Sequence, residues 1–198
     1  MIRIGAVVAA AVLALVGCHR GSADCPRGSQ LHGQKPPAGQ LQWCSRGDGV
    51  KNGPFREWYA NGKLSSAGDY ADGKMEGKWQ SFFDDGALKA EGVFKGGLKD
   101  GIWTQYYNTA DGGKKNRIEE HHAGSAEIKW TAFRNDGSKW AEGMTVGSRP
   151  QGAYTEYYAS GKVAAKANYA AGERVGDWSY FDSEGKPSST PTTSFPKP

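Results

Sequence analysis

The sequence predicts an all-β protein: an elongated, single-layer antiparallel meander of six β-hairpin repeats. Three observations support this prediction. Glycine accounts for 29 of 198 residues, roughly twice its usual share. The chain also has 7 Trp, 9 Tyr and 7 Phe, and these aromatic residues return at a fixed period. Such an aromatic content is atypical of disordered chains. The formal net charge is +4 and no dense basic stripe is present, which argues against nucleic acid as a partner.

Residues 1–17 predict a lipoprotein signal peptide. Arg3 precedes an apolar run of 14 residues, Ile4–Gly17, which is too short to span a bilayer as a helix. The run ends in Leu15-Val16-Gly17-Cys18, which resembles the bacterial lipobox. This resemblance implies cleavage before Cys18, acylation of that residue with fatty acids such as palmitate, and a membrane anchor; His19 at the next position favours the outer membrane. The alternative is an ordinary secretory peptide with an incidental cysteine.

Residues 18–42 predict a lipid-anchored leader closed by a disulfide. After lipidation of Cys18, the remaining cysteines are Cys25 and Cys44, and an even pair in an exported protein indicates a disulfide. The segment between them contains Lys35-Pro36-Pro37-Ala38-Gly39, and we expect it to be irregular. A zinc site with His19 or His32 is the alternative, although the spacing fits no common zinc template.

A 24-residue period organises residues 43–186. The units begin at Gly53, Gly77, Gly101, Ile128, Gly152 and Gly176, in steps of 24, 24, 27, 24 and 24 residues. Each unit is expected to be a hairpin, because Asn-Gly and Asp-Gly pairs are strong signals of tight turns. Further turns at Asp72-Gly73, Gly96-Gly97 and Ala171-Gly172 would link the hairpins into a meander.

Counting outward from a two-residue turn at Asp85-Gly86 predicts which residues face each other. Trp79 would face Gly92, Ser81 would face Ala90, and Phe83 would face Leu88. A large ring opposite a residue without a bulky side chain can lie across the neighbouring strand. The same count pairs Tyr59 with Leu64, Phe55 with Gly68, Trp130 with Gly143, Tyr158 with Val163, and Tyr154 with Ala167.

The frame Gly-x-Trp-x-x-aromatic-aromatic-x-x-Gly resembles the shorter bacterial variant of the MORN repeat. It is clearest from Gly77 to Leu88 and from Gly53 to Leu64, and the resemblance covers about residues 43–186. It implies an elongated, twisted antiparallel sheet that serves as an adaptor. The paired motifs Cys25-Pro26 and Trp43-Cys44 also resemble the start of exported bacterial proteins with such repeats. Choline- and cell-wall-binding repeats are similar hairpins, but their period is nearer to twenty residues.

No catalytic motif is present in the sequence, and we expect neither an enzyme nor a cofactor or metal site. The one cluster of metal-ligand types is Glu119-Glu120-His121-His122, which strand alternation divides into two ligands on each face, below the three of a catalytic zinc site. Continuing the register places Lys115, Arg117, Glu119 and His121 where the previous unit has Leu88, Ala90, Gly92 and Phe94. This polar strand is either functional or the result of drift beside a splayed loop.

The predicted function is that of a non-enzymatic, envelope-anchored binding or scaffold protein with a protein partner. The candidate binding surface is the aromatic face, formed by Phe55, Tyr59, Trp79, Phe83, Trp103, Tyr107, Trp130, Tyr154, Tyr158 and Trp178. A glycan-binding or peptidoglycan-binding module is the alternative, because exposed rings stack on sugars. An antitoxin or immunity-type function is a further alternative. Residues 187–198 are rich in Pro, Ser and Thr and predict a flexible tail.

Overall fold

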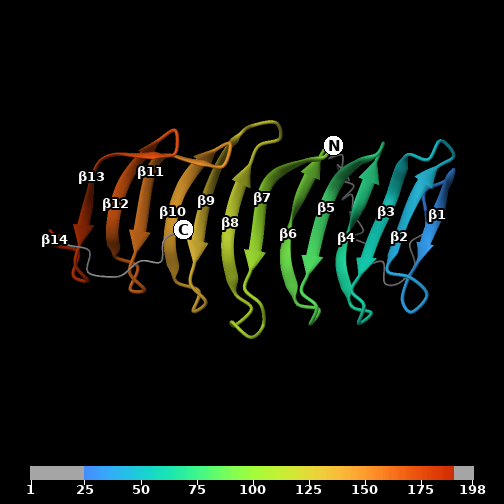
Figure 1. Ribbon diagram of the computed structural model, residues 1–198, viewed down its shortest axis with the longest axis horizontal. Helices are drawn as coiled ribbons and strands as arrows, with labels where there is room; N and C mark the ends of the chain where they lie inside the picture. The colour runs from blue at the N-terminus through green and yellow to red at the C-terminus, as the bar shows by residue number, and fades with distance from the viewer. Residues whose placement is uncertain (1–24, 190–198) are drawn as a thin grey trace, which may run out of the picture.

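The computed structural model describes residues 25–189, and all regular secondary structure in that range is β-strand. Fourteen strands form one open sheet in chain order, each antiparallel to the next (Figure 1). The predicted single-layer meander is therefore confirmed. The strands are β1 (Ser29–Gln34), β2 (Leu41–Arg46), β3 (Lys51–Trp58), β4 (Leu64–Ala71), β5 (Lys74–Phe82), β6 (Leu88–Lys95), β7 (Leu98–Tyr106), β8 (Lys115–His121), β9 (Glu127–Phe133), β10 (Lys139–Val146), β11 (Arg149–Tyr157), β12 (Val163–Ala170), β13 (Glu173–Phe181) and β14 (Pro187–Ser188).

The six predicted hairpins correspond to the consecutive strand pairs from β3–β4 to β13–β14. The turns that link one hairpin to the next are also as predicted. In the turn after β4, Asp72 and Gly73 have φ angles of 49° and 78°, and the flanking residues Ala71 and Lys74 pair with each other. Two successive positive φ values define the tight turn whose twist matches that of the flanking strands.

The turns within the hairpins differ from the prediction. Phe83 N–H donates to the carbonyl of Ala87 at 2.8 Å, so the loop has three residues, 84–86, and Gly86 (φ 88°) takes the left-handed position. Phe82 rather than Phe83 therefore pairs with Leu88. The same correction replaces Tyr59 by Trp58 opposite Leu64, and Tyr158 by Tyr157 opposite Val163.

In the first five hairpins, a bulge beyond the turn returns the register to the predicted one. Ser81 pairs with Ala90 and Trp79 pairs with Gly92, with the register shift lying between Ser81 and Phe82. The remaining predicted pairs are also confirmed: Phe55–Gly68, Trp130–Gly143 and Tyr154–Ala167. The pairing in the middle of each hairpin is thus independent of the exact form of its turn.

The leader is a hairpin rather than the irregular segment that we expected. Strands β1 and β2 pair along their full length, from Ser29–Arg46 to Gln34–Leu41, and β2 joins the repeat array by pairing with β3. Cys25 and Cys44 form the predicted disulfide, with their Cα atoms 5.6 Å apart. Cys18 and the rest of the signal peptide lie outside the described residues.

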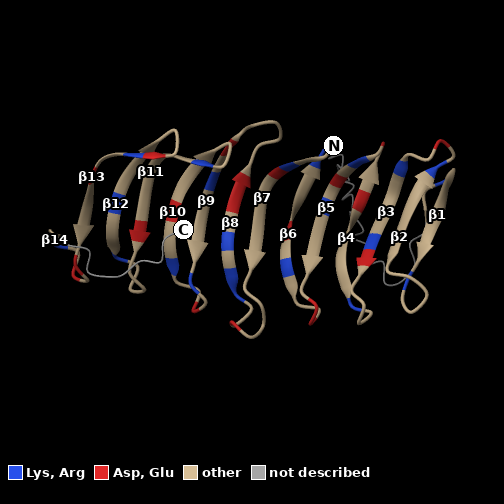
Figure 2. Ribbon diagram, viewed as in Figure 1, with Lys and Arg blue, Asp and Glu red and all other residues tan. Residues whose placement is uncertain are grey.

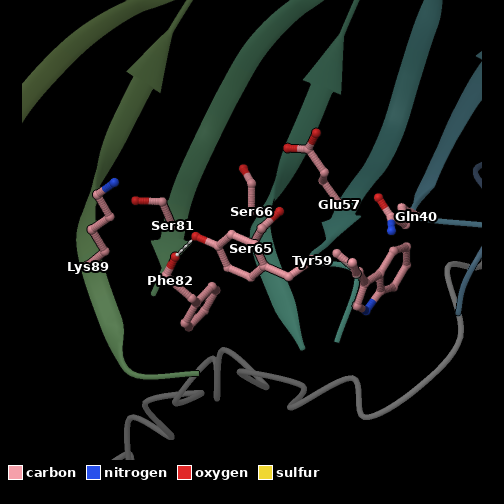
Figure 3. Close-up of a pocket in the computed structure, with 10 residues that line it drawn as sticks. Gln40, Glu57, Tyr59, Ser65, Ser66, Ser81, Phe82 and Lys89 are labelled. Atoms are coloured by element: carbon pink, nitrogen blue, oxygen red, sulfur yellow. Dashed lines mark hydrogen bonds between the residues drawn. The ribbon is translucent and has the colours of Figure 1, made fainter. Parts of the chain in front are cut away.

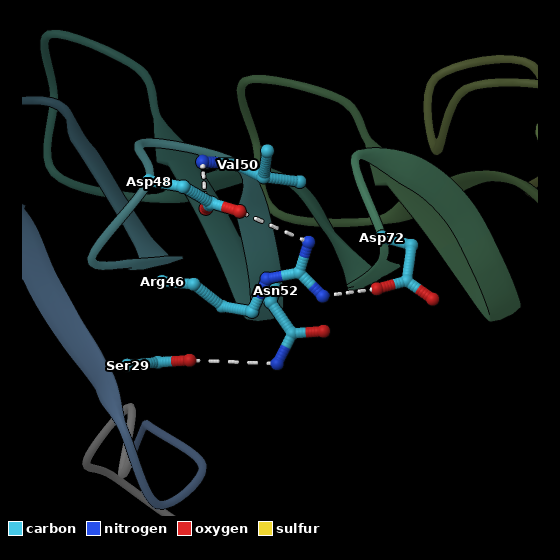
Figure 4. Close-up of polar contacts among 6 residues, drawn as sticks. All are labelled: Ser29, Arg46, Asp48, Val50, Asn52 and Asp72. Atoms are coloured by element: carbon cyan, nitrogen blue, oxygen red, sulfur yellow. Dashed lines mark hydrogen bonds and ion pairs between the residues drawn. The ribbon is translucent and has the colours of Figure 1, made fainter.

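Polar contacts beside the turns that link one hairpin to the next join the leader to the first repeat hairpin (Figure 4). The guanidinium group of Arg46 contacts Asp72 across the sheet and lies 3.3 Å from the carboxylate of Asp48. Asn52 Nδ2 donates to Ser29 Oγ at 3.4 Å. These groups are largely exposed, so their contribution to stability is small; the disulfide and the strand pairing fix the leader on the array.

Within the described residues, the last hairpin of the array has a short return strand. Strand β14, at the start of the predicted tail, pairs with only Tyr180 and Phe181 of β13. Residues 190–198, which make up most of that tail, lie outside the described residues. Within the described range, the sixth hairpin therefore has a full outgoing strand and a two-residue return strand.

Candidate binding surfaces

One face of the sheet, which we call the Trp face, is filled by a row of large rings. In strands β3, β5, β7, β9, β11 and β13 the ring residues are Phe55, Trp79, Trp103, Trp130, Tyr154 and Trp178. Alternation along the strands places every second residue on this face. The face opposite carries mainly polar side chains in the first two hairpins, such as Lys78, Gln80 and Glu91.

The tryptophan rings pack across hairpin boundaries. A Cβ atom added to Gly68 would lie 2.3 Å from the ring of Trp79, and one added to Gly92 would lie 2.2 Å from the ring of Trp103. Each ring thus covers the glycine of the preceding hairpin. The residue above Gly92 is consequently Trp103, and not Trp79, which pairs with Gly92 through the backbone. Packing between neighbours is what stabilises a repeat array.

Hydrogen bonds hold these two rings in place. Trp79 Nε1 donates to the carbonyl of Asp69 at 3.1 Å, and Trp103 Nε1 donates to the carbonyl of Val93 at 3.0 Å. In both cases the acceptor follows the covered glycine in sequence. Trp79 and Trp103 are only 7% and 8% exposed. These two members of the predicted binding surface belong to the core of the sheet; the expectation that they offer an open surface is wrong.

The other predicted surface residues are half-buried. Three of them lie beside the turns within the hairpins and join adjacent hairpins. The hydroxyl groups of Tyr59, Tyr107 and Tyr158 donate to main-chain carbonyls of the next hairpin at 2.7, 2.7 and 2.6 Å. Figure 3 shows the bond from Tyr59 to Phe82, beside a shallow hollow lined by Glu57, Ser66 and Lys89 among others. Phe83, at the equivalent position, has no hydroxyl.

Strand β8 interrupts the row of rings. Edge-on ring contacts connect Phe94 to Trp79 and to Trp103, with centroids 5.8 and 4.9 Å apart. A second set of contacts begins at Trp130, whose centroid lies 6.0 Å from that of Tyr154. The intervening strand β8 presents Arg117, Glu119 and His121 to the Trp face, as the register predicted.

The polar side chains of β8 form an ionic cluster between the two sets of rings. Glu119 accepts a hydrogen bond from Arg117 Nε at 2.8 Å, and its other carboxylate oxygen lies 3.0 Å from His121 Nε2 and 3.7 Å from Lys99 Nζ. The cations of Lys99 and Arg117 also lie over indole rings. Lys99 Nζ is 4.6 Å from the centroid of the Trp103 ring, and Arg117 Cζ is 4.4 Å from that of Trp130, which is the geometry of a cation–π contact.

The cluster keeps Glu119 ionised. Burial raises the pKa of the Glu119 carboxyl, but hydrogen bonds from His121 and Arg117 outweigh this effect and leave the pKa below its ordinary value. The side chain of Glu119 is 15% exposed, whereas those of Arg117 and Lys99 are 29% and 39% exposed. The cluster therefore presents two accessible cations around a largely covered carboxylate.

The ionic cluster weakens the packing between β8 and β9. Glu119 occupies the place taken by Gly92 in the preceding hairpin, so no indole can lie flat there. Nε1 of Trp130 is buried without a hydrogen-bond partner, as is Nε1 of Trp178 in β13, in contrast to the indoles of Trp79 and Trp103. An unsatisfied buried donor costs about 1–3 kcal/mol. In β8, the packing of rings over glycine seen in the first hairpins is replaced by charged side chains.

On the face opposite the Trp face, strands β7, β8 and β10 carry apolar side chains. A shallow groove there is lined by Ile102, Ile118 and Met144, together with Glu120, Lys129 and two threonines. Ile102 is 55% exposed. The polarity of the two faces is therefore reversed at β8. The alternation that places Lys78, Gln80, Lys89 and Glu91 on this second face in the second hairpin places Ile102, Ile118 and Met144 there in the next two.

A second buried carboxyl lies further along the Trp face. Glu156 is 4% exposed and is flanked by Ala141 and Ala165 on the neighbouring strands. Its Oε1 accepts a hydrogen bond from the Tyr154 hydroxyl at 2.6 Å, while its Oε2 has no partner. Burial raises the pKa of Glu156 above its ordinary value in spite of that bond. No sequence signal separates this glutamate from the exposed ones.

Neither a metal centre nor a membrane-spanning helix is found in the described part of the chain. Residues 25–189 contain no group of three or more His, Cys, Asp or Glu side chains arranged to hold a metal ion. His32, the alternative zinc ligand, stacks on Trp43 with a centroid distance of 5.3 Å and lies 2.6 Å from Ser45 Oγ. In the same range, no helix has the length and apolar character needed to cross a bilayer.

Comparison with known proteins identifies three of the hairpins. The family model described as MORN repeat variant matches residues 51–72, 75–95 and 150–171, which correspond to β3–β4, β5–β6 and β11–β12. No curated protein matches the chain. Among solved structures, the chain is similar to the "Crystal structure of GtfA/B complex bound to UDP and GlcNAc" at 11% identity, over 79% of this chain and 29% of that chain. The TM-score of 0.20 carries no argument about fold or function.

Proposed function

We propose that this chain, a MORN-repeat protein, is a non-enzymatic binding or scaffold protein held at the cell envelope by a lipid on Cys18. Its partner is a protein that docks on the Trp face at β8. The three segments that match the MORN repeat variant support the binding or scaffold role. The lipobox ending at Cys18 supports the anchor, and two or more acyl chains would make that anchor stable.

The observation that carries the proposal is the ionic cluster on β8. The first two hairpins cover the Trp face with rings that pack over glycine, and such a face has few groups left for a partner. At β8 the cation of Lys99 lies over the buried Trp103 and that of Arg117 over the half-buried Trp130, and both cations remain partly exposed. Sites where one repeat departs from the common packing at a loss of stability are expected to be functional.

The experiment restores the common packing at β8. The triple variant Arg117→Ala, Glu119→Gly and His121→Phe gives β8 the residues that β6 has at Ala90, Gly92 and Phe94. We expect this variant to be at least as stable as the wild type but to bind the partner about tenfold more weakly or worse, as in other trade-offs between stability and function. Glu57→Ala, which removes an exposed charge from β3, is the control and should bind normally.

The partner is identified by cross-linking from the lipid-anchored chain in intact cells. A photoreactive residue at Lys115, at the start of β8, should capture one protein, and the same residue at Glu57 should not. Binding is then measured with purified proteins. Capture of carbohydrate from the same position would favour the glycan-binding alternative, and capture of a toxin-like protein would favour the immunity-type alternative. Normal binding by the triple variant would refute the assignment of β8 as the binding site.

A further inference from the structure

The face opposite the Trp face carries a row of four side chains across strands β7 to β10. Ile102 pairs with Glu120, Glu120 pairs with Lys129, and Lys129 pairs with Met144. All four line the shallow groove on this face. Figure 2 shows the acidic band of β8 beside a basic band on β9. The order across the sheet is thus apolar, acidic, basic, apolar.

This order is complementary to itself. A two-fold axis that runs parallel to the strands, midway between β8 and β9, places β8 of one copy over β9 of the other and β7 over β10. In that arrangement Glu120 meets Lys129 of the second copy, and Ile102 meets its Met144. Both contacts occur twice because the axis is two-fold. Face-to-face sheets lie about 10 Å apart, so side chains of this length interdigitate.

We propose that two copies of this chain associate through this face, with the two-fold axis between β8 and β9. The next row is compatible with the arrangement: Ile118 faces Thr131 of the second copy, and Glu142 lies opposite Thr104, which is only 9% exposed in its own chain. The carboxylate of Glu142 keeps its partner Lys139, at 3.0 Å. Within these two rows, each charged side chain has an opposite charge close to it, which is the condition for a stable polar interface.

The exposure of the row supports this surface. Ile102 is 55% exposed, although isoleucine is among the residues most often buried. The side chain of Glu120 is 45% exposed, and its nearest basic group is His122 at 4.0 Å. The four-strand row is smaller than a standard interface of about 800 Å² per partner, so the dimer is expected to be weak, with a dissociation constant in the micromolar range or above.

Charge reversal tests the proposal with the purified full-length chain in detergent. Glu120→Lys and Lys129→Glu each place like charges opposite one another at two points, and each should weaken self-association about tenfold or more. An equimolar mixture of the two variants should associate as the wild type does, because each reversed charge then meets its opposite on the other chain. Lys166→Glu, on the same face but on β12, should have no effect.

The mixture separates an interface from an effect within one chain. Glu120 and Lys129 are neighbours in the same sheet, so a purely internal effect of either variant would persist in the mixture. Sedimentation equilibrium measures the association, and thermal unfolding confirms that each variant is folded. Cysteines provide a second test: Ile102→Cys should cross-link to Met144→Cys but not to itself, because the two copies of residue 102 lie about 14 Å apart along the sheet.

Either of two results would overturn the proposal. One is a wild-type chain that sediments as a monomer at every concentration up to about 1 mM. The other is a dimer whose association is unchanged by both charge reversals. Because the row lies on the face opposite to the ionic cluster, neither result bears on the partner site proposed above.

Discussion

Replacing Gly92 by valine should destabilise the array, because Trp103 occupies the space that a side chain would need. A Cβ atom at this position would lie 2.2 Å from Trp103 Cδ2 and 2.5 Å from Trp103 Cγ. The ring would have to move by more than about 1 Å to restore van der Waals contact. It would then lose its hydrogen bond to Val93 and its edge-on contact with Phe94 at 4.9 Å.

The magnitude follows from the contacts that are lost. The indole hydrogen bond contributes about 1 kcal/mol net, and the ring contact contributes about 1 kcal/mol. Re-exposing roughly 50 Å² of the ring costs about 1.2 kcal/mol more. The higher strand propensity of valine returns up to about 1 kcal/mol. The free energy of unfolding should therefore fall by about 2 kcal/mol. Ala87→Val beside the turn is the control and should change it by less than about 0.5 kcal/mol.

Denaturant unfolding of both variants measures the difference, and a double-mutant cycle identifies the ring responsible. The penalty of Gly92→Val should fall below about 1 kcal/mol when Trp103 is replaced by leucine, and it should persist when Trp79 is replaced instead. Similar unfolding midpoints for Gly92→Val and Ala87→Val would refute the packing of rings over glycine. Coupling to Trp79, the backbone partner of Gly92, would refute the assignment of the ring to the following hairpin.

Four further predictions follow. Metabolic labelling with a palmitate analogue should mark the wild-type chain but not Cys18→Ser. Peptide mapping of envelope-purified protein without reductant should recover Cys25 and Cys44 as one linked pair, and Cys44→Ser should cost about 3 kcal/mol of stability. Because the pKa of Glu119 lies below its ordinary value, its stabilisation is complete above about pH 5 and is lost as the pH falls through that lowered pKa; Glu119→Gln should abolish this part of the pH dependence of thermal unfolding. Tyr59→Phe should cost about 1 kcal/mol in denaturant unfolding, because it removes the hydroxyl that joins two hairpins.

The sequence was sufficient to predict the six repeat hairpins and the register in the middle of the first five. Both depend on the spacing of rings and small residues, and a shift of one residue would move every ring to the other face. The turns within the hairpins were less well specified. An Asp-Gly pair fits both a two-residue turn and the last two positions of a three-residue loop, since glycine adopts the left-handed conformation in both. The pairing of Phe83 with Leu88 was wrong for this reason.

The packing between hairpins could not be predicted by counting within a hairpin. Register defines which backbone groups pair, but the direction in which a ring leans depends on the space offered by the adjacent strand. Trp79 and Trp103 lie over Gly68 and Gly92, in each case the glycine 11 residues earlier in the chain, and this spacing is the sequence signal of the packing between hairpins. The leader hairpin was missed for a different reason: its strands do not share the 24-residue period, and its proline pair indicated a loop.

The position of β8 within the array explains how the sheet tolerates a polar strand. In a linear array each hairpin contacts only its neighbours, so a weak interface lowers the stability of one junction without disturbing the others. Glu119 stands where the preceding hairpin has the covered Gly92, and Trp130 Nε1 has no hydrogen-bond acceptor. The ring contacts on both sides of β8 nevertheless continue. If this strand were under selection only to hold the sheet together, replacing Glu119 by glycine would be the simplest improvement. On the proposal made above, the partner that docks on β8 is what retains the charged strand, whereas drift would leave Glu119→Gly without effect on binding.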